Sequence, residues 1–448
     1  MHEFNSEVEE LAKEVLAYSL HRLKSDPPLD GPRSAEDLFK EVGNTITAKG
    51  LGGHQALEVF TSVLAKACIS TDHPRNLAFI PSAPSEHANL FDLVVGASSL
   101  YGGSWQEGAG AVFAENQALQ WLIDLAKLPS SAGGVFVQGG TIGNLSALVV
   151  ARAQARKKHP LVTRFAIACS AEAHSSIASA AMVMDVELLK IEVSESGKLI
   201  GEDVASAIDA FEALGDVRVC AVVATGGTTN LGIIDDIAGI GKVARDRGIW
   251  FHVDGAYGLA ALCAPSVRSH FDGVELADSF IVDPHKWLFA PFDACALVYR
   301  NPELAKEVHQ QKASYLDTLH DDSWSPSDYA INLTRRTRGL PFWFSLAANG
   351  TDAYTQAVEQ SITVAKQAAE LIKNHPNLTL LCEPELSIVA FTVNGWKIED
   401  YAKWSESLLE KQIGFIPYSS HKGQPILRFA IVNPWTTIAD IELILATL

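Results

Sequence analysis

The sequence predicts an α/β fold, in which helices cover a mainly parallel sheet and a smaller α+β domain follows at the C-terminus. Two patterns carry this prediction. Between about 130 and 300, short β-branched runs alternate with stretches of helical apolar spacing. From about 350 onward, a long helical stretch precedes further strands and helices. Strands that alternate with helices are typical of parallel sheets buried on both faces.

The first 70 residues are expected to be helical and to lack a core of their own. Residues 6–24 place apolar side chains on one helical face, and 35–48 and 55–68 also carry apolar helical faces. Ser34 begins the second of these with a pattern that resembles a capping box. Because such helices can hardly bury their apolar faces alone, we expect this segment to pack on the main body or on another subunit.

Strands are expected in two groups. The first group is predicted at 133–138, 164–169, 217–224, 249–253, 278–282 and 294–299. No helix separates the last two of these runs, so one antiparallel strand is expected. The second group is predicted at 378–382, 387–393 and 426–432, in the C-terminal domain.

Composition and charge exclude several classes of protein. There are 35 Lys and Arg residues against 53 Asp and Glu, a net charge of −18, which opposes binding to nucleic-acid phosphates. No stretch approaches the roughly 20 apolar residues of a membrane span, and the N-terminus lacks the apolar segment of a secretory signal. The six cysteines have no metal-ligand or disulfide-framework spacing. We therefore expect a soluble cytoplasmic protein with no metal, membrane or nucleic-acid partner.

The most informative stretches are HVDGAYG at 252–258 and DSFIVDPHKW at 278–287. Asp254 ends one predicted strand, and Lys286 follows another in an apolar context. Burial lowers the pKa of a lysine and makes its amine nucleophilic, as Schiff-base chemistry requires. A carboxylate at a neighbouring strand end can keep the ring nitrogen of such a cofactor protonated. The alternative is an aspartate at the edge of the core and an ordinary salt-bridged lysine.

A glycine turn in VFVQGGTIGNLSAL (135–148) joins a strand to a helix. Gly139 and Gly140 let the backbone approach a ligand, and the N-terminus of the following helix suits a phosphate. Thr141 and Asn144 lie in its first turn. A plain strand–helix turn is the alternative interpretation.

Two further signals follow strands of the same predicted sheet. His174 could stack on a planar cofactor or relay a proton, although a lone histidine is more often structural or a helix cap. The turn GGTTNLGIID at 226–235 places hydroxyl groups after a strand, although it could serve backbone shape alone. Taken together, the four signals favour a cofactor site over their separate structural explanations.

The segments HVDGAYG, ADSFIVDPHKWLFAPFDACALVYR and EAHSS resemble the pyridoxal-phosphate-dependent group II amino-acid decarboxylases, which act on aromatic amino acids, glutamate or diaminobutyrate. Residues 73–91, the GGTIGN turn and segments of 315–350 extend the similarity. The resemblance implies pyridoxal 5'-phosphate as the cofactor, and a homodimer with active sites at the subunit interface. It also implies the fold-type I (aspartate aminotransferase-like) architecture with a seven-stranded, mainly parallel sheet. The expected divisions are an N-terminal helical segment (1–70) that packs on the dimer partner, a large cofactor-binding domain (71–349) and a small domain (350–448).

The resemblance assigns roles to matching residues. Lys286 matches the lysine that carries the cofactor, Asp254 the partner of the pyridine nitrogen, and His174 the histidine that stacks on the ring. Thr229 matches a hydroxyl near the cofactor, and Ala256 the small residue under the ring.

The phosphate side is assigned in the same way. Thr141, Ile142 and Gly143 match the phosphate-binding turn, with Asn144 beside it, and His285 matches another contact on that side.

Some positions match less closely. Pro81 and Ser82 fall where the family contacts substrate. Asp283 stands where some members have an asparagine near the phosphate, and since a carboxylate is a poor phosphate ligand, we expect its side chain to turn away. The family's mobile loop corresponds to 320–333 and differs in length, so Tyr329 does not align securely with the loop tyrosine that protonates the carbanionic intermediate. The proton donor is left open.

The activity predicted is α-decarboxylation of an L-amino acid to its amine and CO₂, with Lys286, Asp254 and His174 as catalytic residues. An aldehyde-forming oxidative deaminase, a carbon–carbon lyase or an aminotransferase of the same fold are alternatives. A late arginine that would bind an aminotransferase substrate is not evident. A non-catalytic binding protein is a more distant alternative. The sequence leaves open which amino acid is the substrate and whether assembly goes beyond a dimer.

Overall fold

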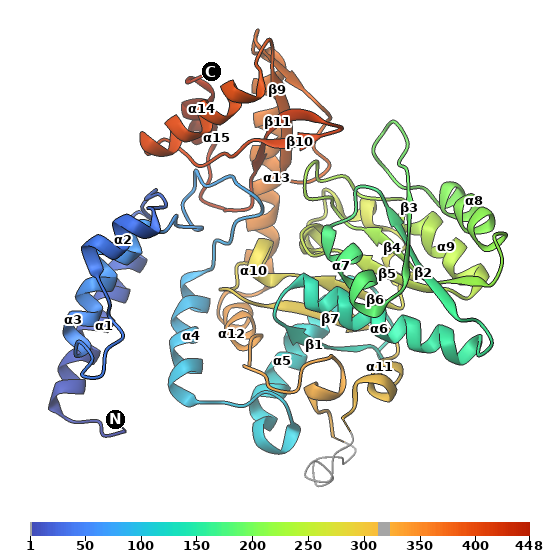
Figure 1. The fold of residues 1–448 in the computed structure, drawn as a ribbon, viewed down its shortest axis with the longest axis horizontal. Coiled ribbons are helices and arrows are strands. Elements are labelled where there is room, and N and C mark those ends of the chain that lie inside the picture. Colours follow the sequence, from blue (N-terminus) through green and yellow to red (C-terminus); the bar gives the residue numbers. More distant parts are fainter. Residues whose placement is uncertain (1, 312–322) are drawn as a thin grey trace.

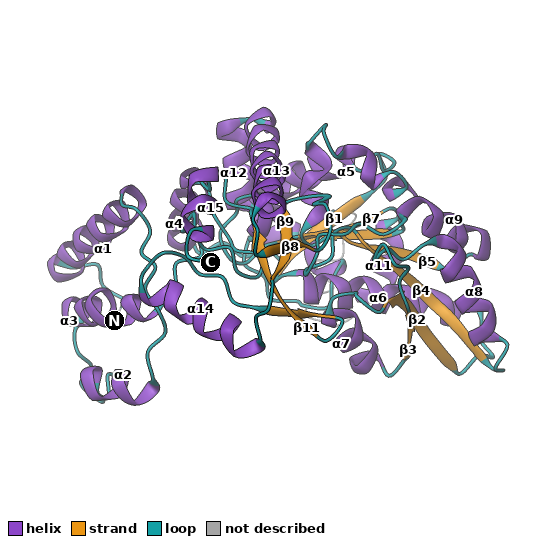
Figure 2. Ribbon diagram, turned by 90° about the horizontal axis from the view of Figure 1, so that it is seen from above, coloured by secondary structure: helices purple, strands orange, loops and turns teal. Residues whose placement is uncertain are grey.

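The computed structural model describes residues 2–311 and 323–448, and within them two sheets organise the chain (Figures 1 and 2). The larger sheet has the strand order β1-β7-β6-β5-β4-β2-β3. Its strands are β1 (Gly133–Val137), β2 (Arg164–Ser170), β3 (Glu187–Ile191), β4 (Val217–Thr225), β5 (Trp250–Asp254), β6 (Ser279–Val282) and β7 (Cys295–Tyr299). The predicted seven-stranded α/β sheet is thus confirmed.

Strand directions in the large sheet also match the prediction. β3, β2, β4, β5 and β6 pair in parallel, whereas β7 is antiparallel to both of its neighbours, β6 and β1. β3 was not predicted from the sequence. It is an edge strand with mostly half-buried residues, so it lacks the continuous apolar run that revealed the others.

Helices cover both faces of this sheet. α6 (Gly140–Lys158), α7 (Ser175–Met184) and α11 (Pro302–His309) pack on one face. α5 (Trp105–Leu125), α8 (Gly201–Glu212) and α9 (Ile237–Arg247) pack on the other. Along β1, Val135 and Val137 face the first layer while Phe136 faces the second, which is the alternation a doubly covered strand requires.

The C-terminal part forms a second, antiparallel sheet with its own core. Its strand order is β10-β11-β9-β8. The strands are β8 (Leu378–Leu380), β9 (Ile388–Val393), β10 (Ser419–His421) and β11 (Gln424–Ala430), with helices α14 (Ile398–Glu410) and α15 (Ile438–Leu445). The long helix α13 (Thr351–Asn374) runs from α12 (Leu340–Asn349) and packs against this sheet and α15. Three of the strands were predicted, and the short β10 was not.

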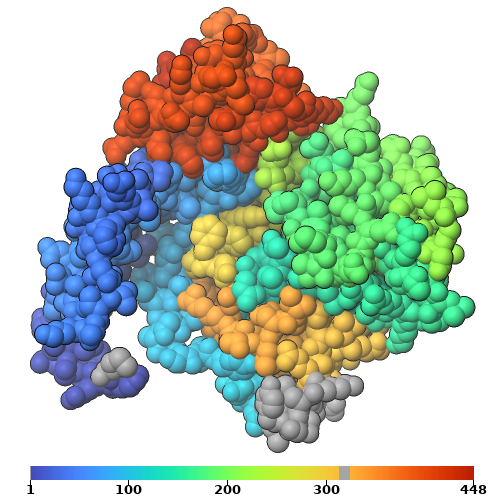
Figure 3. All heavy atoms as spheres, in the orientation of Figure 1, coloured from blue at the N-terminus to red at the C-terminus, as the bar shows by residue number. Residues whose placement is uncertain are grey.

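The N-terminal helices form a lobe beside the main body (Figures 1 and 3). They are α1 (Ser6–Lys24), α2 (Ala35–Val42) and α3 (Gly53–Val59), followed by a π-helical turn (Phe60–Leu64), a 3₁₀ turn (Ala65–Ala67) and, after a loop, α4 (Glu86–Ser98). The Ser34 side chain caps α2 as predicted, but α2 ends earlier than expected because Gly43 adopts a positive φ of 68°. None of the described helices is both long and apolar enough to cross a membrane.

Candidate active site

A cavity of about 310 Å³ lies where the carboxyl ends of β4 and β5 meet the N-terminal ends of α6 and α7. Parallel α/β sheets place ligand sites at this edge. The structure brings most of the predicted site residues to this cavity: Thr141, Asn144, His174, Thr229, Asp254, Ala256, His285 and Lys286. The four segments that the sequence singled out therefore meet in space.

Asp254 is the last residue of β5 and is buried. Its Oδ2 accepts a hydrogen bond of 2.9 Å from Asn144 Nδ2, and its Oδ1 accepts one of 3.2 Å from the backbone N–H of Ala256. Each carboxylate oxygen therefore has one fixed donor and keeps one lone pair. The arrangement holds an anionic carboxylate in one orientation at the cavity wall.

Lys286 lies in α10 (Pro284–Trp287), a single helical turn that follows β6. Its Nζ is 3.0 Å from Oδ2 of Asp283, which is itself buried. Burial alone would lower the pKa of Lys286, but the carboxylates of Asp283 and Asp254 outweigh it and the pKa is raised. The prediction that the apolar setting lowers this pKa is therefore wrong for the chain without cofactor.

Asp283 itself departs from the sequence-based expectation. Its side chain was expected to turn away, yet its carboxylate lines the cavity and pairs with Lys286. Its Oδ2 is also 3.8 Å from His285 Nε2 and would lie 3.2 Å from a Cβ placed on Gly140. The ammonium group of Lys286 explains this orientation, because a buried carboxylate needs a positive partner.

The glycine turn forms the start of α6. Gly139 is its N-cap with a φ of 120°, a conformation that side-chain-bearing residues rarely adopt. The backbone N–H groups of Ile142 and Gly143 both donate to the Gly139 carbonyl at 3.1 Å, and these two residues do not line the cavity. The first-turn N–H groups that lack an intrahelical partner are those of Gly140 and Thr141, which do line it.

His285 stands beside this turn. Its ring Cε1 would lie 3.8 Å from a Cβ placed on Gly139, and its Nδ1 is 2.7 Å from the backbone carbonyl of Ala294. The backbone N–H of Ala294 also lies 3.2 Å from Nδ1. Because the Ala294 backbone occupies Nδ1, Nε2 is the ring nitrogen left for other groups in the cavity.

His174 is a helix cap, which is one of the two interpretations that the sequence offered, and it also reaches the cavity. It is the N-cap of α7, where its Nδ1 accepts a hydrogen bond of 3.2 Å from the backbone N–H of Ser176. Its side chain also lines the cavity and is solvent-exposed in this chain. A helix cap thus fixes a ring at the mouth of the site.

Several cavity residues escaped the sequence analysis. These are Gln138, Ser176, Thr225, Gly227, Tyr257, Phe292 and Asp293. Gln138 directly precedes the glycine turn and could have been found from that motif. Within the described part of the chain, Gln138 Oε1 and Thr225 Oγ1 are buried without a hydrogen-bond partner.

Other predicted residues lie elsewhere. Pro81 and Ser82 are buried but do not line the cavity, and the Ser82 hydroxyl donates to the Ala290 carbonyl at 3.3 Å. Tyr329 is buried and stacked on Trp324, which packs at Gly133, the end of β1 that is remote from the glycine turn. The first three residues of the predicted mobile loop (320–333) lie outside the described residues, as do all of 315–319.

One buried arginine late in the chain was missed. Arg428 on β11 donates from Nη1 to the carbonyls of Phe79 (2.7 Å) and Thr229 (3.1 Å). It thereby ties the small sheet to two loops near the site. Arg428 is not among the residues that line the cavity.

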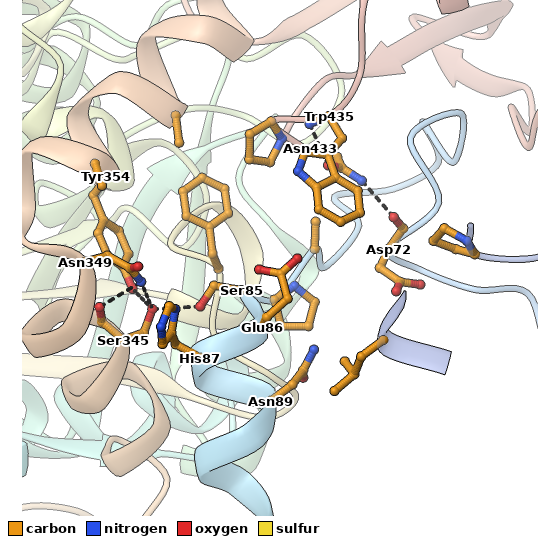
Figure 4. A pocket seen from close by; sticks show the side chains of 18 of the residues that line it. Asp72, Ser85, Glu86, His87, Asn89, Ser345, Asn349, Tyr354, Asn433 and Trp435 are labelled. Atoms are coloured by element: carbon orange, nitrogen blue, oxygen red, sulfur yellow. Dashed lines mark hydrogen bonds between the residues drawn. The ribbon is translucent and has the colours of Figure 1, made fainter. Parts of the chain in front are cut away.

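A second cavity, of about 210 Å³, lies between the end of α1, the start of α4, and α12 and α13 (Figure 4). It contains none of the predicted site residues. At its inner end, Ser345 Oγ lies 2.7 Å from Ser85 Oγ and accepts a hydrogen bond of 2.7 Å from Tyr354. These hydroxyl groups already satisfy one another, and we assign this cavity no function.

Comparison with known proteins identifies the family. Residues 44–394 match the pyridoxal-dependent decarboxylase conserved domain. The chain belongs to this family. It is 30% identical to an aromatic-L-amino-acid decarboxylase of Drosophila lebanonensis, over 82% of this chain and 95% of that protein. It is 29% identical to mouse cysteine sulfinic acid decarboxylase, over 93% of this chain and 89% of that protein.

A solved structure shares the fold of this chain. The structure of Oryza sativa TDC with PLP and tryptamine superposes with a TM-score of 0.93 at 23% identity, and covers 100% of this chain and 99% of that one. Members of the pyridoxal-dependent decarboxylase family use pyridoxal 5'-phosphate, so this chain is a pyridoxal-phosphate-dependent enzyme.

The cavity residues fit this cofactor. A lysine amine, a carboxylate held at a strand end and a free helix N-terminus are the groups that an aldehyde, a pyridine nitrogen and a phosphate need. The unpartnered Gln138 Oε1 and Thr225 Oγ1 show that the wall still has hydrogen-bonding capacity for a polar ligand.

Proposed function

We propose that this member of the pyridoxal-dependent decarboxylase family removes the α-carboxylate of an L-amino acid to give the amine and CO₂. The observation that carries the proposal is one cavity lined by Lys286, the bonded carboxylate of Asp254 and the glycine turn at the start of α6. An amine, an acid and an anion site in this arrangement support amine chemistry on a phosphorylated pyridine.

Pyridoxal phosphate, when bound, supplies an electron-accepting ring that takes up the electron pair released with CO₂. Asp254 supports this by holding a proton at the ring nitrogen, since a buried carboxylate stabilises the positive charge there. His174, exposed at the cavity mouth and fixed by its helix cap, covers the open side. Gly140 and Thr141 offer their backbone N–H groups to the phosphate.

Lys286 would hold the cofactor through its amine, and the cofactor would supply an aldehyde group with which this amine, or a substrate amine in its place, can condense. Because its ammonium form is stabilised by Asp283 at 3.0 Å, attack requires that a proton leave Nζ. Asp283 Oδ2, at 3.0 Å from Nζ, is placed to accept that proton. We therefore assign Asp283 the role of accepting a proton from Lys286.

The test is a panel of L-amino acids with aromatic, acidic and diamino side chains. For each, CO₂ and amine are measured together on the cofactor-loaded protein. Equal amounts of both products support the proposal. Turnover without CO₂ from every member of the panel would contradict it.

An aldehyde-forming oxidative deamination is the second candidate. The observation that favours it is the position of Tyr329, which is stacked on Trp324 and does not line the cavity. Tyr329, which is among the described residues, is therefore not placed to return a proton to the substrate carbon. The same panel separates the two activities, because the aldehyde-forming reaction also releases CO₂ but gives aldehyde and ammonia in place of the amine, and it consumes O₂ and forms H₂O₂.

We also propose that the chain acts as a homodimer, divided into segments 1–70, 71–349 and 350–448. In α1, α2 and α3 no side chain is buried. Apolar side chains remain exposed along this lobe, which stands apart from the body in Figure 3: Phe4, Val8, Val15, Leu16, Leu20, Phe39, Ile46, Phe60 and Leu64. Obligate dimer interfaces commonly bury about 2,000 Å² or more with an apolar centre, and this lobe suits that use.

Deleting residues 1–70 tests this assembly. If the lobe packs on a partner, the truncated protein should aggregate or lose cofactor, although all the residues that line the cavity remain. Sedimentation of the full chain should give a dimer. A truncated protein that sediments as a soluble, fully active monomer would rule out this packing.

A further inference from the structure

A chain of buried hydrogen bonds runs from the cavity into the sheet behind Asp254. Asp254 Oδ2 accepts from Asn144 Nδ2 at 2.9 Å, and Asn144 Oδ1 lies 2.9 Å from His252 Nε2. His252 Nδ1 lies 2.8 Å from Ser279 Oγ, which accepts a hydrogen bond of 2.9 Å from Trp250 Nε1. All five side chains are buried, and His252 and Ser279 have 0% exposure.

The secondary structure places these groups together. His252 on β5 and Ser279 on β6 are register partners in the parallel sheet. Asn144 lies in the first two turns of α6, which packs across β5 and β6. The sheet and the helix thus bring an imidazole between an amide and a hydroxyl group.

The direction of each hydrogen bond in this series follows from the two side chains at its ends, Asp254 and Trp250. Asp254 as a carboxylate can only accept, so Asn144 presents its NH₂ group to it and its oxygen to His252. That oxygen needs a donor, which puts a hydrogen on His252 Nε2. At the other end, Trp250 can only donate, so Ser279 Oγ accepts from it and keeps its own hydrogen available for His252 Nδ1. The first end requires, and the second end accommodates, a neutral imidazole protonated on Nε2.

The amide of Asn144 has no other satisfactory orientation. Its Nδ2 also donates to Ser176 Oγ at 2.9 Å, so both amide hydrogens are used. A turned amide would direct its oxygen at the carboxylate of Asp254 and leave acceptors facing each other. Burial lowers the pKa of His252 to about 4, although the nearby Asp254 carboxylate opposes this shift. The neutral ring therefore persists near neutral pH.

We propose that His252 is a positioning residue that holds Asp254, through Asn144, in the orientation facing the cavity, and that Ser279 completes the hydrogen bonds of the imidazole tautomer this requires. The inference rests on the proposed role of Asp254 opposite the ring nitrogen of the cofactor. It assigns no direct contact with substrate or cofactor to His252.

The first test reads the tautomer itself. The full-length holoenzyme, labelled with ¹⁵N-histidine, is examined by long-range ¹H–¹⁵N NMR at pH 7, and the signals lost in His252→Gln identify His252. A neutral ring protonated on Nε2 is expected, and this tautomer should persist in Ser279→Ala because Asn144 Oδ1 still accepts from Nε2. A ring protonated on Nδ1 or a cationic ring would overturn the proposal.

The second test uses matched variants of the holoenzyme. His252→Gln keeps a side-chain N–H that can reach Asn144, whereas His252→Leu does not. We expect His252→Leu to weaken cofactor binding and lower kcat by about 10- to 100-fold with KM changed less than about threefold, and His252→Gln to restore most of this loss. The control is His309→Leu, since His309 is also buried but bonds the Ser146 carbonyl at 3.1 Å, and cofactor affinity should be retained.

Equal losses in the Leu and Gln variants of His252 would overturn the proposal, because they would show a packing role only. The NMR result does not depend on the reaction catalysed. An enzyme that shows the expected tautomer and the difference between the variants, yet releases no CO₂, would support this inference and contradict the proposed function.

Discussion

Removing the carboxylate of Asp283 should make the amine of Lys286 more reactive. In Asp283→Asn the ion pair of 3.0 Å between Asp283 Oδ2 and Lys286 Nζ is lost, while a side chain of the same shape remains. Two unit charges at this distance attract by about 5–6 kcal/mol at an effective dielectric constant of about 20. If a quarter of that energy is effective after screening, the neutral amine at fixed pH becomes about tenfold more abundant.

The assay is the rate at which an amine-specific acylating reagent modifies Lys286 at pH 7–8. Protein without cofactor is used, and modification is followed by mass spectrometry of the peptide that contains this lysine. Asp293→Asn is the matched control, because Asp293 lines the same cavity but pairs with Arg338 at 2.7 Å. Modification should be about tenfold faster in Asp283→Asn and close to wild type in the control.

Equal modification rates in Asp283→Asn and wild type would refute the reasoning. That result would mean that the ammonium form does not depend on Asp283, and the assignment of Asp283 as proton acceptor would fail with it. Faster modification in both variants would instead attribute the effect to the overall negative charge of the cavity.

Three other changes have defined outcomes. Lys286→Ala should abolish turnover and the visible absorbance of bound cofactor while circular dichroism stays native, and borohydride trapping on another lysine would contradict this. Asp254→Asn should still bind cofactor but lower kcat by about two to three orders of magnitude, and a near-normal kcat would leave Asp254 a structural role only. Burial raises the pKa of Glu115 to about 7, although the backbone N–H of Gly339 donates a hydrogen bond to its carboxylate. The protonated side chain therefore contributes to the stability of the fold in full below about pH 4.5, and this contribution is lost as the pH rises to 7. Denaturant titrations should show wild type losing about 3 kcal/mol relative to Glu115→Gln between pH 4.5 and 8, and a constant difference would exclude this ionisation.

The sequence alone determined most of the large sheet and singled out the candidate reactive groups. Strands such as β4 and β5 are buried on both faces and so appear as uninterrupted apolar runs. Asp254 and Lys286 could be proposed as site residues because Asp254 ends such a run and Lys286 follows another by a few residues. The same reasoning missed β3, since Glu187 and Lys190 interrupt its apolar pattern at the edge of the sheet.

Tertiary structure decided how those groups are used. Asp283 and Lys286 are three residues apart, the spacing at which side chains meet on a helical turn, but only the single turn α10 makes that spacing effective. Tyr329 lies near the sequence position expected for the loop tyrosine. It stacks on Trp324, however, and does not line the cavity. Asn144 and His252 are 108 positions apart, and nothing local relates them. Their contact exists because α6 crosses β5 at that point, and the hydrogen-bonding capacity of a buried side chain is decided by such neighbours rather than by its place in the chain.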